Sequence, residues 1–164
     1  MSYSWNWQVF LQPSATGEGT YLSWLFEGLK WTVTLSLTAW IIALIVGSII
    51  GVLRTVPNRW LGIIAATYVE IFRNIPLLVQ LFIWYFVLPE LLPGKMGNAF
   101  KQMHPLAQQF LAAMVCLGLF TAARISEQVR SGIQSLTRGQ RAAGYALGLT
   151  EWQTYRHVLL PMAY

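Results

Sequence analysis

The chain has 164 residues, a length that usually makes one soluble domain, but its composition excludes a soluble one. Hydrophobic residues make up 55% and charged residues 10%, whereas ordinary globular chains carry about 25% charge. The net charge of +5 comes from eleven basic and six acidic residues. The one cysteine, Cys116, leaves no disulfide framework within the chain. The composition therefore predicts a membrane protein.

The first predicted membrane span covers residues 31–53, WTVTLSLTAWIIALIVGSIIGVL, which include no charged side chain. A helix rises about 1.5 Å per residue, so this stretch can cross a hydrocarbon layer of about 30 Å. Gly47 and Gly51 lie four residues apart near its end, a spacing of small residues that lets another helix approach closely. Residues 1–30 are then predicted to form a periplasmic segment ahead of the span.

A second span is predicted over residues 61–92. It joins a moderately apolar stretch to the strongly apolar run IPLLVQLFIWYFVLPELL. Pro76 suits the first turn of a new helix or the kink of a longer one that begins near Trp60, and we favour the kinked helix. The polar residues 93–104 that follow are expected to form a loop.

The third span is predicted over residues 105–129. Arg124, Glu127 and Arg130 lie near its end at spacings of three, so they share one helix face and can pair. The three spans belong to a transmembrane region of residues 31–134. Charges at such a boundary either anchor the helix at the interface or serve the function.

The distribution of basic residues predicts the orientation. Three lysines fall on one side of the predicted membrane, and eight arginines fall on the other: Lys30, Lys95 and Lys101 against Arg54, Arg59, Arg73, Arg124, Arg130, Arg138, Arg141 and Arg156. Cytoplasmic loops are enriched in Lys and Arg, so the arginine side is cytoplasmic and the N-terminus lies outside.

Residues 135–161 form a cytoplasmic segment with the sequence signals of two short helices. Thr137 with Gln140, and Thr150 with Gln153, have the capping-box spacing, and Gly148 lies where the first helix should stop. We expect helices over residues 138–147 and 151–160. The first is rich in Ala and Gly, so it is thin enough to enter a groove in another protein.

The same segment resembles the cytoplasmic loop of ABC importer permeases. That loop reads Glu-Ala-Ala, three residues, Gly, nine residues, then Ile-x-Leu-Pro. Gly148 is followed by nine residues and then by Val158, Leu160 and Pro161. The strings GIQSLTRGQ, ALGLT, YVEIFRNIPLLVQLF, RTVPNR and CLGLFTAARISEQVR resemble the polar amino acid branch, and within it the glutamate/aspartate import permeases.

The resemblance implies an all-α, polytopic protein with the type I ABC importer permease fold, in the bacterial inner membrane. The chain would be an N-terminal fragment that ends after three spans and the coupling helices. The implied partners are a cytoplasmic ABC ATPase dimer, a second related permease chain, a periplasmic amino-acid-binding protein and membrane lipid. No nucleic acid, cofactor, metal or catalytic residue is implied for this chain.

Nine positions of the loop are implied to couple the permease to the ATPase: Gly139, Gln140, Arg141, Ala142, Ala143, Ala146, Leu147, Gly148 and Leu149. The Glu-Ala-Ala of the pattern falls on Ala142, Ala143 and Gly144, so its glutamate is absent. Arg141 is expected to be an exposed charge whose loss is mild. Gln80 and Glu127 are candidates for lining the substrate path, although Gln80 is more simply explained by an interhelical hydrogen bond.

Three other functions fit the residues less well. A secondary transporter or channel would also show spans and boundary charges, but it does not explain the capped helix pair and its Gly-x9-V-x-L-P spacing. A DNA-binding helix-turn-helix needs a denser basic face. An enzyme is not indicated, because His104 and His157 have no nucleophile or carboxylate pair beside them. The sequence also has no phosphate-binding loop, so ATP hydrolysis is expected from a separate subunit.

Overall fold

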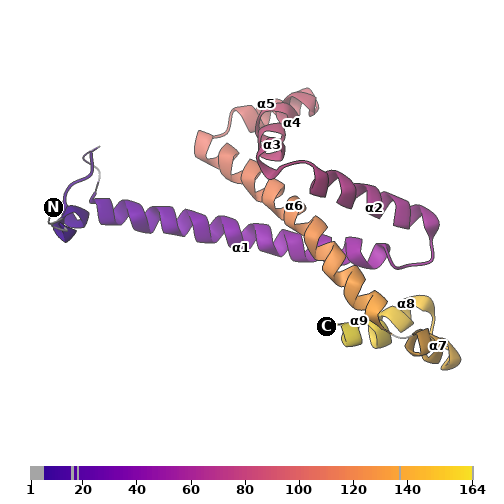
Figure 1. The fold of residues 1–164 in the computed structure, drawn as a ribbon. Helices are drawn as coiled ribbons and strands as arrows, with labels where there is room; N and C mark the ends of the chain where they lie inside the picture. Colours follow the sequence, from indigo (N-terminus) through magenta and orange to yellow (C-terminus); the bar gives the residue numbers. More distant parts are fainter. Residues whose placement is uncertain (1–5, 16, 18, 137, 164) are drawn as a thin grey trace. The chain divides into compact units, whose positions relative to one another are not determined.

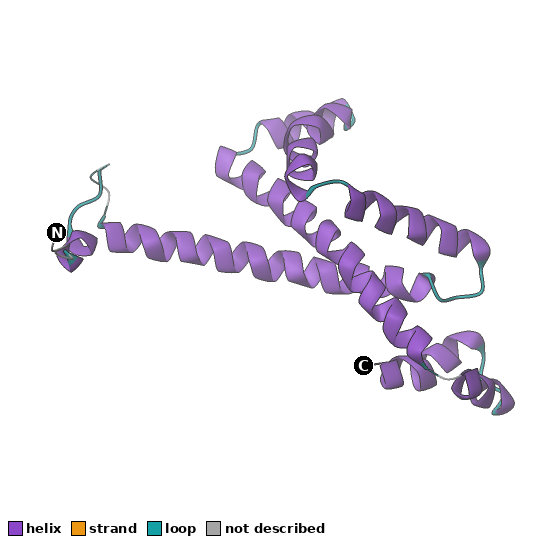
Figure 2. Cartoon of the chain, in the orientation of Figure 1, coloured by secondary structure: helices purple, strands orange, loops and turns teal. Residues whose placement is uncertain are grey.

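The computed structural model describes residues 6–15, 17, 19–136 and 138–163. In this part the regular elements are helices, joined by short loops (Figure 2). The chain divides into two units within the first long helix, between Leu37 and Thr38. The first unit holds the short 3₁₀ helix η1 (Trp7–Leu11) and the start of α1. The second holds the rest of α1 and all the later elements.

Two helices are long and apolar enough to cross a membrane, α1 (Tyr21–Leu53) and α6 (Pro105–Ser135) (Figure 1). Both outrun their predicted spans. Residues 21–30 are mostly apolar or aromatic, so they continue the helix through part of the segment expected to precede the span. Large hydrophobic side chains such as Ile41 and Ile45 remain more than half exposed, as lipid-facing residues do.

The second unit is packed through small residues where α1 meets α6. A Cβ added to Gly47 would lie 2.8 Å from the backbone oxygen of Ala122, and one added to Gly51 would lie 2.8 Å from that of Ser126. Because real Cβ atoms essentially never come that close, only glycine permits this approach. The predicted role of the glycine pair is confirmed, and its partner is α6.

The segment predicted as one kinked helix over residues 61–92 is two helical pieces. Helix α2 (Arg59–Asn74) is followed by α3 (Leu77–Phe82), the π-helical turn η2 (Ile83–Val87) and α4 (Leu88–Leu91), and the direction changes by 103° at the break. The single kinked helix was therefore wrong. The residue before a proline is disfavoured in helical geometry, and Ile75 is extended with φ −90° and ψ 127°. In the described part of the chain, two helices are long and apolar enough to cross a membrane, or three if this bent pair counts as one span.

Residues 94–101, expected to lie in a loop, form helix α5 (Gly94–Lys101). Pro93 stands at its N-cap, where a proline costs little. The Gln108 amide closes its other end by donating to the carbonyls of Phe100 and Lys101, each at 2.8 Å. The side chains of Lys101 and Glu90 also pair at 2.6 Å.

The C-terminal segment contains α7 (Arg138–Ala146), α8 (Glu151–Thr154), the π-helical turn η3 (Tyr155–Leu159) and α9 (Leu160–Ala163). The two predicted helices are confirmed, with a π-turn inside the second. Ile133 of α6 forms a buried cluster with Tyr155 and Leu159. This cluster fixes the segment to the end of α6.

Candidate functional site

The turn between α7 and α8 has the predicted geometry. Gly148 has φ +78°, a left-handed conformation that side chains other than glycine rarely adopt. The Thr150 hydroxyl accepts from the Gln153 backbone N–H at 3.4 Å, and the Gln153 side chain accepts from the Thr150 N–H at 2.9 Å. The second capping box is thus confirmed, whereas the first depends on Thr137, which lies outside the described residues. The helix pair is held by local hydrogen bonds at its turn.

Gly144 brings α7 against α8. A Cβ at Gly144 would lie 2.7 Å from the Thr154 methyl carbon and 3.0 Å from its hydroxyl oxygen. Gly144 and Thr154 are both buried. The alanine that the family pattern has at this position would therefore force the two helices apart.

A hydrogen-bonded chain connects this helix pair to the loop between α1 and α2. The Tyr155 hydroxyl donates to the Thr55 carbonyl at 2.7 Å, and the Arg141 guanidinium donates to the Tyr155 oxygen at 2.5 Å. Arg141 also lies over the Tyr155 ring, 5.2 Å from its centroid, and pairs with Glu151 at 3.6 Å. The expectation that Arg141 is a plain exposed charge was wrong, because its side chain turns inward to Tyr155 and Thr55.

The remaining predicted coupling residues separate by face. Those on the outward face of α7, and in the turn after it, are exposed: Gly139, Ala142, Ala143, Ala146, Leu147 and Gly148. Gln140 and Leu149 are partly buried with Arg141 on the side that faces the protein. Leu147, in the turn after α7, is 79% exposed. The outward face is small, apolar and open.

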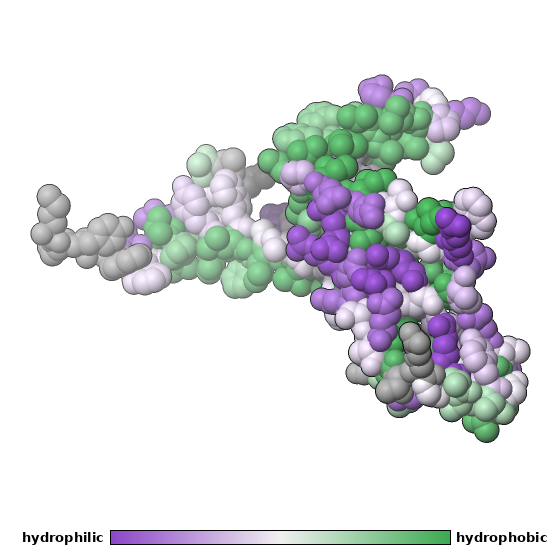
Figure 3. Space-filling view, turned by 45° about the vertical axis from the view of Figure 1, so that its right-hand side comes forward, coloured by the Kyte–Doolittle hydropathy of each residue, from purple (hydrophilic) through white to green (hydrophobic). Residues whose placement is uncertain are grey.

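Glu127 lies at the centre of an ion-pair cluster that the sequence shows only in part. Its carboxylate meets Arg54 at 2.5 Å, Arg130 at 2.9 Å and Arg73 at 3.4 Å. Arg54 follows α1, Arg73 ends α2 and Arg130 is in α6, so one carboxylate joins three helices. Helical spacing predicted pairing with Arg124 and Arg130, and only the Arg130 pair is found; Arg124 instead lies over the Phe120 ring, 4.6 Å from its centroid. The Arg54 and Arg73 contacts could not be predicted from spacing, because these residues are 73 and 54 positions away in sequence. Figure 3 shows hydrophilic residues gathered across the middle of this unit.

Gln80 is buried, with 4% exposure, at the break between α2 and α3. Its amide nitrogen donates to the carbonyls of Phe72 and Ile75, each at 2.9 Å, and so satisfies acceptors that the broken helix leaves open. This agrees with the simpler interpretation of Gln80 as a structural hydrogen-bonding residue. Its Oε1 is buried and has no hydrogen-bond partner in the described part of the chain.

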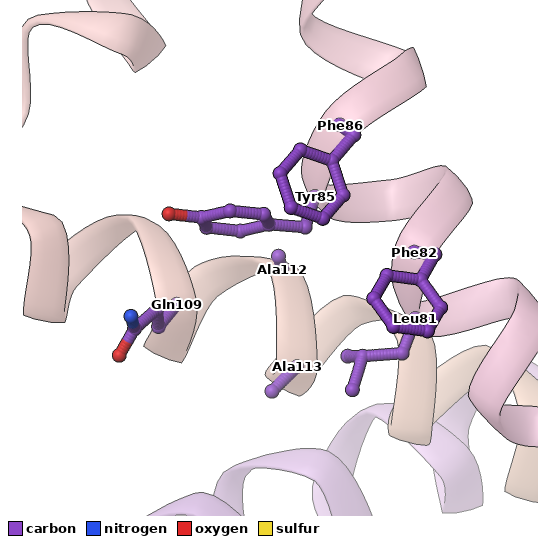
Figure 4. A pocket seen from close by; sticks show the side chains of 7 residues that line it. All are labelled: Leu81, Phe82, Tyr85, Phe86, Gln109, Ala112 and Ala113. Carbon is purple, nitrogen blue, oxygen red and sulfur yellow. The ribbon is translucent and has the colours of Figure 1, made fainter.

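A cavity of ≈ 280 Å³ lies between η2 with its flanking turns and the first half of α6 (Figure 4). The rings of Phe82, Tyr85 and Phe86 line one wall, and Ala112 and Ala113 line the other. Gln109 contributes an amide to the lining. Neither Gln80 nor Glu127 lines this cavity, so the structure does not bring the two candidate path residues together there.

Comparison with known proteins gives the same result from three directions. Residues 43–164 match the family described as "Binding-protein-dependent transport system inner membrane component". The glutamate/aspartate import permease protein GltJ of Escherichia coli K12 is 58% identical over the whole chain, which covers 67% of that protein. GltK of Escherichia coli O6:H1, with the same description, is 36% identical over 99% of the chain and 67% of its own length.

One solved structure, described as the crystal structure of an amino acid ABC transporter with histidines, matches with a TM-score of 0.67 and 29% identity. The match covers 87% of this chain and 61% of that one. Sequence and fold therefore agree, and the chain belongs to the inner-membrane components of binding-protein-dependent transport systems.

Proposed function

We propose that this chain is a permease subunit of an ATP-driven importer that carries glutamate or aspartate across the bacterial inner membrane. The observation that carries the substrate assignment is the 58% identity to GltJ along the entire chain. The arginine transport system permease ArgU of Corynebacterium glutamicum is only 35% identical. A neutral or basic amino acid is the next candidate.

The partners follow from the proposed function. A cytoplasmic ATPase dimer supplies the energy, a second related permease chain completes the membrane path, and a periplasmic binding protein delivers the amino acid. The outward face of α7 is the ATPase joint. Its alanines and glycine have small side chains or none, so a groove in the partner can come close to the helix backbone. Burial of the exposed Leu147 side chain in that groove would stabilise the contact.

The proposed mechanism transmits motion of α7 into the spans through two contacts. The Arg141–Tyr155–Thr55 chain carries displacement to the end of α1. The cluster of Ile133, Tyr155 and Leu159 carries it to α6. When the ATPase subunits close on ATP, the joint moves as a unit, because the Gly148 turn and the capping box hold α7 and α8 together.

Competition for uptake tests the substrate. The full-length permease is reconstituted in proteoliposomes with its ATPase, its partner permease and its binding protein, and uptake of labelled glutamate is measured. Excess unlabelled glutamate or aspartate should abolish the signal, and arginine or histidine should not. Absence of labelled glutamate uptake, or glutamate uptake that excess arginine or histidine abolishes, would contradict the proposal.

A further inference from the structure

Two neighbouring hollows follow each other along the α1–α6 pair. The first, of ≈ 380 Å³, is a mainly apolar groove whose walls include Trp40, Leu44 and Val129. The second, of ≈ 250 Å³, lies at the ends of both helices, where Arg54 and Arg141 line it. Ile133 lines both hollows, so the apolar groove and the cationic hollow adjoin at this residue.

Two arginines, Arg54 and Arg141, line the cationic hollow. Arg54, Arg73 and Arg130 share a single carboxylate, that of Glu127. Arg141 has Glu151 as its acidic partner, at a loose 3.6 Å. Arg54 therefore shares its carboxylate with two other arginines and Arg141 has only a loose acidic partner, so the two lining arginines are compensated only in part; the hollow also presents the side chain of Gln134. Such a site favours an anion with several oxygen acceptors.

We propose that these hollows bind one anionic phospholipid, with its headgroup phosphate between Arg54 and Arg141 and an acyl chain along α1 and α6. Basic pockets between membrane helices on the cytoplasmic side suit anionic headgroups. Trp40 of the groove and Arg54 of the cationic hollow are 14 residues apart, about 21 Å along a helix, so the two hollows together have a length that suits an acyl chain and its headgroup. A free phosphate ion would leave the apolar groove unused. Ser48 and Gln128 supply the polar groups on the groove wall, where the lipid esters would lie.

Native mass spectrometry of the full-length permease, purified with its partner subunits in detergent, tests the site. The probes are palmitoyl-oleoyl phosphatidylglycerol, the matching phosphatidylcholine, short-chain dihexanoyl phosphatidylglycerol and inorganic phosphate. Long-chain phosphatidylglycerol should bind at least about ten-fold more tightly than phosphatidylcholine, because only it carries a net negative headgroup. Dihexanoyl phosphatidylglycerol and phosphate should bind weakly, since neither fills the groove.

Two variants divide the site. Arg141→Gln removes a headgroup partner, and Ser48→Trp fills the groove while leaving the arginines in place. Each should lower phosphatidylglycerol binding about ten-fold. Arg156→Gln is the control, because it removes an exposed positive charge from the same segment but lines neither hollow; its binding should equal that of the wild type.

Three results would overturn the proposal. Equal binding of phosphate and long-chain phosphatidylglycerol would identify a free-anion site. Equal binding of the two long-chain lipids would show that the arginines do not select a headgroup. Unchanged phosphatidylglycerol binding by Ser48→Trp would show that polypeptide, and not lipid, occupies the groove. This last test does not depend on how well Arg141→Gln folds, and none of the readouts depends on the transported substrate.

Discussion

The hydroxyl of Tyr155 donates a hydrogen bond to the backbone carbonyl of Thr55, which lies 2.7 Å away and 100 residues earlier in the chain. Tyr155 is 2% exposed, so this bond is sheltered from water. It links the C-terminal helix pair directly to the loop that connects α1 to α2, and Arg141 adds a longer hydrogen bond to the same carbonyl at 3.5 Å.

Tyr155→Phe should weaken this link and leave the buried ring in place. The change removes the hydroxyl that donates to the Thr55 carbonyl and accepts from the Arg141 guanidinium. Leaving a buried polar group without its partner typically costs about 1–3 kcal/mol. We expect slower uptake per ATP hydrolysed, measured in proteoliposomes, with normal membrane insertion. Tyr145→Phe is the matched control, because Tyr145 is 46% exposed and its hydroxyl bonds weakly to Glu151 at 3.4 Å. Equal effects of the two variants on uptake would contradict the proposed role of the Tyr155 hydroxyl in transmitting motion.

Glu127→Gln should destabilise the second unit more than Arg73→Gln does. The first change leaves three arginines without their shared carboxylate. The second removes the most exposed partner, at 54%, whose pair with Glu127 is worth at most about 1 kcal/mol. Thermal unfolding of the purified permease measures the loss of Tm in both variants. A larger loss for Arg73→Gln would argue against Glu127 as the centre of the ion-pair cluster. These contacts give Glu127 a structural role, which is an alternative to its proposed role in lining the substrate path.

Gly144→Ala should separate α7 from α8, although it restores the alanine of the family pattern. The added methyl would meet Thr154 at 2.7 Å, well inside ordinary contact. Gly62→Ala is the control, since nothing lies within 4 Å of a Cβ there and alanine favours a helix interior. We expect a lower Tm and impaired uptake for Gly144→Ala alone. The double variant Gly144→Ala with Thr154→Ser should recover part of the loss, because serine lacks the Thr154 methyl group with which the added Cβ would clash.

Features set by local chemistry could be predicted from the sequence. The Gly148 turn and the Thr150–Gln153 capping box depend on residues a few positions apart, and the Gly47–Gly51 spacing indicated a close helix contact. Features that join distant segments could not be predicted. Nothing local pairs Arg54 with Glu127 or Tyr155 with Thr55. The contact of Arg141 with Tyr155 is equally invisible in the sequence, which predicts an exposed charge at Arg141. Pro76 is an intermediate case. It indicated where the helix is interrupted, but the sequence does not encode the angle between the two helical pieces.

The predicted orientation is tested by cysteine labelling. Asn98→Cys in α5 and Trp152→Cys in α8 both lie at exposed positions. The native Cys116 is fully buried, so its background should be low. With the arginine side in the cytoplasm, a membrane-impermeant maleimide added to intact spheroplasts should label position 98 and not position 152 until the cells are opened. Labelling of both from outside would contradict the three-to-eight distribution of basic residues as a guide to this topology.

The outward face of α7 is the proposed ATPase joint, and Ala143→Trp probes it by shape. Ala143 is exposed in this chain, so a tryptophan there should not disturb the permease fold. A bulky ring inside a close interface typically costs about 1–3 kcal/mol, and each 1.4 kcal/mol is about ten-fold in association. We therefore expect weaker co-purification of the ATPase and uncoupling of ATP hydrolysis from uptake. Loss of the Arg141 side chain should act differently from Ala143→Trp. It removes a contact with Tyr155 inside the permease, so it should lower Tm.

Ala99→Trp supplies the control for this experiment. Ala99 is an exposed alanine in α5, on the side of the membrane predicted to be periplasmic, so it receives the same added ring far from any cytoplasmic partner. Its ATPase recovery should match that of the wild type. If Ala143→Trp also kept wild-type recovery and uptake, the small residues of α7 would not form the joint. The contact would then have to lie on another exposed surface of the segment, such as the one around Trp152, which is 67% exposed.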